Sequence, residues 1–600
     1  MKNNVVCIFV DSVTWEAVGT TRAKVSATPF LDSLKAESFT ATKLYSHGPY
    51  TDAAKTSLFT GRNCLDDYAY YFRENTSPVT DFKLFHEAGY ETYCFSYPFW
   101  LYGKSIREHI DHIVYTAGFI FGSEWGSAFN YYYDLAQKSK LDETDYLLFT
   151  KRLSHFFYAF EKYLFDMRDK PESSILYGKC MEGFDLEDAI NKLKIEKEEF
   201  EKSPREYIDV ILKEGKNCKL SMIDTTLIKS IIDGNFLNKI YHQHKALFNK
   251  IKINNFRANI FSLLPSIKRV YWGLRRYVKY KDSSELIFLV NYLIALTPIH
   301  RMIKIWNNIG WQNDNTTHTI LKGGIECLRK RKDPNRPFYM YLNTDDPHNY
   351  LSMFAYDTQN EDVVNDELKV LEEYVDKLGR KFKGNLLYFL SLRYVDYEIE
   401  KFCKELKKMG LWDTTTLMVV SDHGSSYTFY PLHNRRVNCF DDECYHIPVL
   451  IRHPGFKGIE VNTYQNSKDI LPTLCDIVGI DKSPFFQGHS MLDPKRPQND
   501  FVMTEYMGPG CPDVLKRRMW LSIRDNHYMI AYKVGVYELF NEGELCEVYD
   551  LIKDPKAYYN INDVIKRSDI QYLLNHLEER YEEVKKDAFA FVEDIRSNNI

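Results

Sequence analysis

Short apolar runs alternate with helix-like segments over the first hundred residues. Val5–Val10 is a continuous run of apolar, largely β-branched residues, which is typical of a strand buried on both faces of a parallel sheet. Phe82–Ala88 has helical spacing and is followed by Gly89, a residue that often ends helices. Glu91–Phe95 has the pattern of the next strand. This alternation predicts an α/β fold with a mostly parallel central sheet flanked by helices.

The same alternation returns near residue 336. Three further apolar runs predict buried strands, at 338–342, 414–420 and 447–452. Two helical segments between and after them each end at a glycine, 386–409 at Gly410 and 467–478 at Gly479. We therefore expect one α/β domain that is built from residues 1–100 and 336–500.

The stretch between these two parts has a different character. Residues 101–335 are rich in Tyr, Phe, Lys and Glu at helical spacing and contain few strand patterns, so we expect a large, mainly helical insertion. After residue 500 the pattern changes to short strands at 520–523 and 527–532 and a charged helix over about 569–592. This predicts a small antiparallel subdomain with a terminal helix over 501–600.

Composition narrows the class of protein. Of 600 residues, 44% are hydrophobic and 27% charged, which is ordinary for a globular chain and argues against global disorder. The net charge of −5 lacks the basic excess of nonspecific nucleic-acid binders, so no nucleic-acid partner is expected. Twelve cysteines without a Cys-x-x-Cys pair favour reduced thiols. The most apolar stretch, 286–296, is too short for a membrane span. We expect a cytoplasmic protein without a signal peptide, with contact to a membrane surface as an alternative.

Polar side chains follow three of the predicted strands, where a strand itself does not need them. They are Asp11, then Asp345, Asp346 and His348, then Asp422 and His423. Ligands of open α/β sheets bind beyond the carboxyl ends of the strands, so these clusters are expected to converge, although each alone is equally typical of a helix N-cap. Gly424 would permit the sharp turn after His423. Carboxylate and imidazole together suit zinc, manganese or another divalent first-row ion.

A short helix is predicted to begin at Thr51 and to end near Gly61. The N–H groups and dipole at a helix N-terminus favour an anion, and a hydroxyl beside a divalent cation is easier to ionise. Lys55, one turn later, could stabilise a developing oxyanion. This segment alone favours the alternative, that Thr51 is only an N-cap.

Together these residues resemble the sulfatase-like branch of the alkaline phosphatase superfamily. Leu58-Phe59-Thr60-Gly61-Arg62 matches the end of that family's nucleophile segment without a gap, which places Thr51 at the nucleophile and Lys55 at its arginine. Further matches follow in family order at 82–92, 345–348, 394–396, 420–424, 442–455, 469–474, 487–490 and 549–555. The resemblance covers about 1–100 and 336–565. The metal ligands it implies are Asp11, Thr51, Asp422 and His423.

Two departures from the family pattern bear on function. Thr51 cannot be oxidised to the formylglycine of sulfatases, and Ser12 stands where many sulfatases have a second Asp. A threonine nucleophile with an Asp-His pair looks like the phosphoethanolamine and phosphoglycerol transferases of the superfamily. The resemblance thus implies an enzyme that moves a phospho-alcohol from a phosphodiester or phospholipid-type donor to a glycan or lipid-glycan acceptor, as in polysaccharide biosynthesis. Alternatives are a phosphodiesterase or phosphonate monoester hydrolase, a sulfatase, and a non-catalytic scaffold.

The resemblance also implies roles for other residues. Phospho-Thr51 is the expected intermediate, Lys55 and His348 would stabilise phosphoryl oxygens, or His348 would protonate the leaving group, and His433 would lie near that group. One divalent ion is expected, manganese or zinc, with magnesium or calcium as alternatives. Residues 101–335 lie outside the resemblance, and we expect this insertion to build the acceptor pocket. A basic segment in it could meet an anionic glycan or headgroup or, at least as readily, form a solvated face: Lys268, Arg269, Arg275, Arg276 and Lys279.

Overall fold

The computed structural model describes most of the chain outside the middle of the predicted insertion. The described residues are 2–21, 24–66, 77–96, 103–115, 121–170, 185–214, 317–348, 386–425, 440–496, 500–508 and 514–597, with a few helical positions at 278 and between 369 and 378. The basic segment 268–279, apart from position 278, and the apolar stretch 286–296 lie outside them. In the part of the chain that is described, no helix is both long and apolar enough to cross a membrane.

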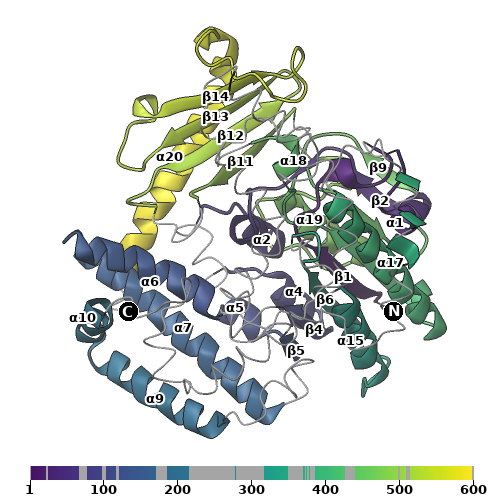
Figure 1. The fold of residues 1–600 in the computed structure, drawn as a ribbon, viewed down its shortest axis with the longest axis horizontal. Coiled ribbons are helices and arrows are strands. Elements are labelled where there is room, and N and C mark those ends of the chain that lie inside the picture. Colours follow the sequence, from purple (N-terminus) through teal and green to yellow (C-terminus); the bar gives the residue numbers. More distant parts are fainter. Residues whose placement is uncertain are drawn as a thin grey trace.

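An eight-stranded sheet forms the centre of the molecule (Figure 1). Its order is β5-β4-β6-β1-β7-β8-β2-β9. The strands are β1 (Asn4–Val10), β2 (Ser38–Ala41), β4 (Glu91–Ser96), β5 (His112–Tyr115), β6 (Phe338–Thr344), β7 (Thr415–Val420), β8 (Val449–Arg452) and β9 (Ile459–Val461). β1 pairs in parallel with β6 and β7, whereas β8 runs antiparallel to both β7 and β2. The mostly parallel sheet that the apolar runs predict is confirmed.

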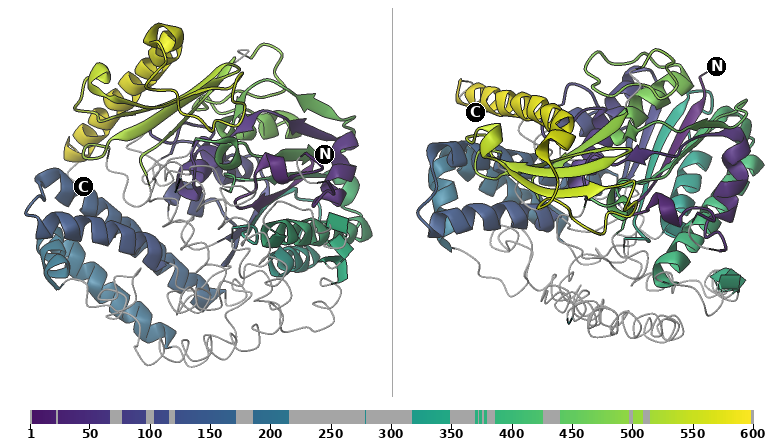
Figure 2. Two further views of the ribbon diagram at one scale, coloured as in Figure 1. Left: turned by 45° about the horizontal axis from the view of Figure 1, so that its top comes forward. Right: turned by 90° about the horizontal axis from the view of Figure 1, so that it is seen from above.

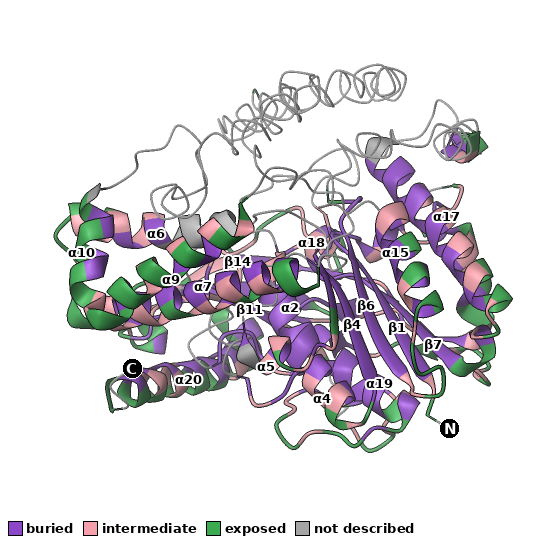
Figure 3. Cartoon of the chain, turned by 90° about the horizontal axis from the view of Figure 1, so that it is seen from below, coloured by how far each residue is buried: buried purple, intermediate pink, exposed green. Residues whose placement is uncertain are grey.

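Helices cover both faces of this sheet (Figure 3). Successive side chains of β1 point to opposite faces, and every residue of this strand is therefore buried. Val5, Cys7 and Phe9 belong to one core, and Val6, Ile8 and Val10 belong to the other. The first core includes α2 (Thr51–Thr60), α4 (Asp81–Glu87) and α19 (Ile470–Val478). The second includes α1 (Pro29–Leu34), α15 (Thr317–Arg329) and α17 (Leu386–Lys408).

The described part of the predicted insertion is mainly helical, but the central sheet continues into it. β5, inside 101–335, is the edge strand beside β4, and α15 packs on β6. The remaining described helices of this region are α5 (Lys104–Arg107), α6 (Phe121–Gln137), α7 (Glu143–Asp169), α9 (Leu186–Lys202) and α10 (Pro204–Glu214). Asp166 of α7 accepts hydrogen bonds from Arg107 and, at 2.6 Å, from Tyr115 of β5. This contact fixes α7 against the sheet.

The C-terminal part is the small antiparallel unit that the sequence predicts. Its strands, in sheet order, are β11 (Phe501–Tyr506), β12 (Met519–Asp525), β13 (Tyr528–Val534) and β14 (Glu544–Asp550). The long helix α20 (Arg567–Ser597) packs on this sheet and also contacts α7, so the inserted helices and the C-terminal helix lie next to each other (Figure 2).

A buried ion-pair network joins α20 to the segment that follows α2. Arg580 donates to both carboxylate oxygens of Glu505, at 2.7 and 3.0 Å, and to Asp66. All three side chains are at most 6% exposed. The Glu505 carboxylate also accepts from the backbone N–H of Leu65 at 2.9 Å.

We predict that Arg580→Met strongly destabilises the protein, because it leaves two buried carboxylates without their cation. Breaking a buried pair from one side costs about 3–5 kcal/mol. The measurement is thermal and urea unfolding, with Lys586→Met, an exposed position on the same helix, as the matched control. A variant at Arg580 that unfolds like wild type would contradict this prediction.

Candidate active site

Thr51 is the first residue of α2 and lies at the carboxyl-end edge of the central sheet. Its hydroxyl oxygen is 3.1 Å from Nε2 of His423 and 3.4 Å from Oδ2 of Asp11. The chain reaches the helix through Gly48, where a Cβ atom would lie 2.3 Å from the Cβ of Ala53. Gly61, in the left-handed region at φ +63°, ends the helix. The helix start predicted at Thr51 is therefore correct.

Asp11, Asp422 and His423 form a buried cluster around that hydroxyl. Asp11 follows β1, and the other two follow the neighbouring strand β7. Nε2 of His423 is 3.8 Å from Asp11 and 3.5 Å from Asp422. One ligand atom from each of the three lies within 4.8 Å of the others. The four side chains expected around a metal thus lie together, and their roles remain predictions.

The orientation of the cluster leaves ligand atoms available for a cation. Asp422 uses Oδ1 to accept from the backbone N–H of Ser12 (3.1 Å) and of His423 (2.8 Å). Its Oδ2 is buried and accepts no hydrogen bond from the described residues. Nδ1 of His423 lies 2.8 Å from the carbonyl of Gly424, so the Nδ1–H tautomer leaves the Nε2 lone pair facing the carboxylates. This donor set fits a divalent first-row ion.

The charges of the site act strongly on one another. Burial and the neighbouring charge of Asp11 raise the pKa of Asp422. Burial acts in the same direction on Asp11, but His348, His423 and Lys55 hold the pKa of that carboxyl below its ordinary value. Burial acts to lower the pKa of His423, and the two carboxylates outweigh it, so that the pKa is raised. Two adjacent buried carboxylates favour positive charge between them.

Ser12 and Gly424 shape the two loops, though not as the sequence suggests. Gly424 is not in the left-handed region; it is required because a Cβ there would lie 1.9 Å from the carbonyl oxygen of Glu443. The left-handed residue is Ser12, with φ +65°, a conformation that is uncommon outside glycine. Its hydroxyl donates to Asp11 at 2.7 Å while its N–H holds Asp422. One residue therefore orients both carboxylates.

Three further catalytic residues were predicted, and the structure describes two of them. Lys55 is buried, and its Nζ lies 2.8 Å from Oδ1 of Asn343 and 4.4 Å from the ring centroid of Phe9. His348 is exposed, and its charge is among those that act on Asp11. His433 lies outside the described residues.

Asp346, one of the polar residues that follow β6, caps a helix, which is the alternative that the sequence left open for each of these groups. Its carboxylate accepts from the N–H of Thr317 at 2.7 Å and from the hydroxyl of Thr317 at 2.6 Å, at the start of α15. Burial raises the pKa of Asp346 to about 7. Asp346 therefore holds a helix in place.

Sequence reasoning missed three residues beside the site. Ser12 appeared only as a departure from the family pattern, and Asn343 carried no signal because it lies within a buried strand. The third is Arg152 of α7, which acts on Asp52, the residue after Thr51. Burial raises the pKa of Asp52 to about 6, and Lys55 and Arg152 counteract that effect. The inserted helix α7 thus brings positive charge close to α2.

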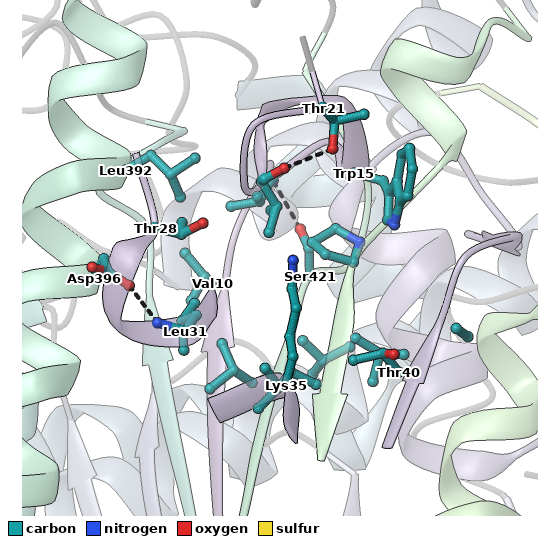
Figure 4. A pocket seen from close by; sticks show the side chains of 18 of the residues that line it. Val10, Trp15, Thr21, Thr28, Leu31, Lys35, Thr40, Leu392, Asp396 and Ser421 are labelled. Carbon is teal, nitrogen blue, oxygen red and sulfur yellow. Dashed lines mark hydrogen bonds between the residues drawn. The ribbon is translucent and has the colours of Figure 1, made fainter. Parts of the chain in front are cut away.

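A separate cavity of about 110 Å³ is lined in part by Ser421, the residue before Asp422 (Figure 4). Its walls are largely aliphatic and include Val10, Leu31 and Leu392 from the second core. Ser421 reaches it, but this hydroxyl donates to the carbonyl of His423 and accepts from the N–H of Val13. None of the four clustered side chains lines this cavity, so it is distinct from the candidate active site.

Comparisons with known proteins find a family match and several relatives. The family model described as Sulfatase matches residues 3–149 and 270–480. Lipoteichoic acid synthase 1 of Bacillus subtilis is 28% identical over 169 residues, which are 27% of this chain and 24% of that protein. The uncharacterized sulfatase YidJ of Escherichia coli is 24% identical over 346 residues, 50% of this chain and 64% of that protein. The chain therefore spans less than two thirds of either relative.

A solved structure also aligns with this chain. Phosphonate monoester hydrolase of Agrobacterium radiobacter aligns at a TM-score of 0.47 and 13% identity, over 98% of this chain and 96% of that one. The family match is the stronger finding, because it covers more than half of the chain and contains Asp11, Thr51, Asp422 and His423. The chain belongs to the sulfatase family of enzymes.

Proposed function

We propose that this protein is a metal-dependent phosphoryl-group transferase that works through a phospho-Thr51 intermediate. It moves a phospho-alcohol of the phosphoethanolamine or phosphoglycerol type to a glycan or lipid-glycan acceptor. The observation that carries the proposal is the Thr51 hydroxyl, at the N-terminus of α2 and within 3.4 Å of both His423 and Asp11. The similarity to lipoteichoic acid synthases is consistent with a transferase, and the threonine at position 51 is the feature that favours it over a sulfatase.

A divalent ion belongs to this proposal, since sulfatase-family enzymes use one. Asp11, Asp422 and His423 would hold it together with Thr51, and the buried Oδ2 of Asp422 fits that purpose. Manganese or zinc suits the mixed oxygen and imidazole ligands better than magnesium or calcium. When bound, the ion supplies positive charge that favours ionised Thr51 and offsets the charge of the phosphate.

The protein's own residues account for the rest of the chemistry. The Thr51 oxygen forms a bond to phosphorus while the bond to the donor alcohol breaks, and that alcohol gains a proton in place of the one lost by Thr51. His348, the exposed imidazole at this edge, is our candidate proton donor. The N–H groups of α2 and the ammonium of Lys55 would stabilise the phosphoryl oxygens. A second alcohol then takes the group from Thr51.

The side chain at position 51 distinguishes this proposal from a sulfatase. Threonine cannot supply the formylglycine aldehyde, whereas its hydroxyl is a competent nucleophile for phosphorus. Hydrolysis would use the same intermediate with water as acceptor, so product analysis must separate it from transfer. A phosphodiester or phospholipid-type donor, contact with a membrane surface and a cytoplasmic location remain predictions.

Thr51→Ala is predicted to lower turnover by at least about a thousandfold, because the covalent route loses its nucleophile. Thr51→Ser is the matched control and should keep measurable turnover, since it retains the hydroxyl. The assay follows release of the donor alcohol from a phosphodiester donor, with and without an added glycan. Full activity in the alanine variant would refute the assignment of the nucleophile, and alcohol release that yields only free phospho-alcohol would favour the hydrolase.

Asp422→Asn combined with His423→Ala is predicted to abolish metal binding. Two of the three clustered protein ligands are then removed, and the remaining carboxylate holds a divalent ion poorly. Elemental analysis after dialysis should find about one manganese or zinc per wild-type chain and almost none in the variant. Asp476→Asn, an exposed carboxylate on α19, should bind metal as wild type does. Equal metal content in all three proteins would rule out this site.

A further inference from the structure

Lys55 is a fully buried lysine that donates a hydrogen bond to a side chain of the neighbouring strand β6. It lies one turn after Thr51, and its Nζ is 2.8 Å from Oδ1 of Asn343. Both side chains are 0% exposed. The ring of Phe9 faces the ammonium at 4.4 Å, an arrangement that adds cation–π attraction. The charge of Lys55 acts to lower the pKa of both Asp11 and Asp422.

Asn343 holds this ammonium from a defined place in the sheet. It lies on β6, opposite Phe9 of β1 in the pairing register, and is followed by Thr344, the last residue of the strand that leads to His348. A lysine ammonium has donors and no acceptor, so the amide must turn its oxygen toward Lys55. The hydroxyl of Tyr341 donates to the same oxygen at 3.4 Å. The orientation of the Asn343 amide is therefore set by its two neighbours.

The identity of residue 55 explains why such a tether matters. A lysine is a compact charge on a flexible stem, whereas an arginine presents several donors in a rigid fork. The family motif has arginine at this position, so a lysine here needs another group to fix its ammonium. Burying a charge without a hydrogen-bond partner is also costly. The Asn343 oxygen meets both requirements.

We propose that Asn343 is a positioning residue for phosphoryl transfer, which acts by holding the Lys55 ammonium toward the phosphoryl group at Thr51. The proposal rests on the proposed function, because it assigns Lys55 to a phosphoryl oxygen. It predicts that Asn343 affects turnover and phosphate affinity only when Lys55 is present. A merely structural hydrogen bond would contribute whether or not Lys55 is present.

Ser96 provides a matched control on the neighbouring strand. β4 pairs with β6 in parallel with Phe95 opposite Leu342, so Ser96 is at the level of Asn343 on the same face. Its hydroxyl is buried and has no hydrogen-bond partner among the described residues. Ser96→Ala therefore removes a polar group from the same layer without touching Lys55.

The experiment is a double-mutant cycle with Asn343→Leu, Lys55→Met and the double variant. Two readouts are needed: kcat and KM with a phosphodiester donor, and the Kd for inorganic phosphate of the manganese-loaded protein, measured by calorimetry. We expect Lys55→Met to lower kcat by about a hundredfold or more and Asn343→Leu by about tenfold, mostly in kcat rather than KM. The double variant should match Lys55→Met alone, and phosphate affinity should follow the same pattern. Ser96→Ala should stay within about twofold of wild type.

The proposal would be overturned if the losses in kcat of the two single variants multiply in the double variant. It would also be overturned if Asn343→Leu keeps the kcat and the phosphate affinity of wild type. If the leucine variant does not fold, Asn343→Ala removes the same acceptor with less bulk, and the same outcomes apply. If the wild-type protein is active and the losses of the two single variants multiply in the double variant, only the role of Asn343 is refuted. A wild-type protein that neither turns over donor nor binds phosphate removes the proposed function together with this inference.

Discussion

The site depends on holding two buried carboxylates and an imidazole close together where strands β1 and β7 end. Asp11 and Asp422 repel each other in a buried position, and the lone pair of His423 adds a third donor between them. Like charges at such distances disfavour ionisation of both groups. In the proposed function, a divalent ion held there would offset that repulsion and would favour ionisation of the neighbouring Thr51 hydroxyl.

The fold maintains this arrangement through contacts on every side of the cluster. Ser12, in a strained backbone conformation, orients both carboxylates, and the close approach of Gly424 to Glu443 sets the path of the loop that carries Asp422 and His423. Helix α2 is held by the Lys55–Asn343 hydrogen bond and, beyond its end, by the network around Arg580. Residues from both ends of the chain thus contribute to the position of one hydroxyl.

Much of this architecture follows from local patterns in the sequence. Buried strands appear in the sequence as apolar runs, and helix ends coincide with Gly61, Gly410 and Gly479. Of the polar residues that follow the strands, Asp11, Asp422 and His423 lie together, whereas Asp346 caps a helix. Strand direction does not appear in such patterns, so the antiparallel β8 could not be predicted. The four residues of β5 were too short a run to separate from the helices around them. The role of Asn343 needs the register of β6 against β1, which only the three-dimensional structure gives.

The most direct test of the account is a mass spectrum of the peptide that contains Thr51, taken after the protein is incubated with manganese and a phosphodiester donor and then quenched in acid. The account predicts a phospho-alcohol mass increment on Thr51, which disappears when a glycan acceptor is added before the quench. Turnover of the donor with no adduct on this peptide at any time, or with the adduct on a different residue, would contradict it.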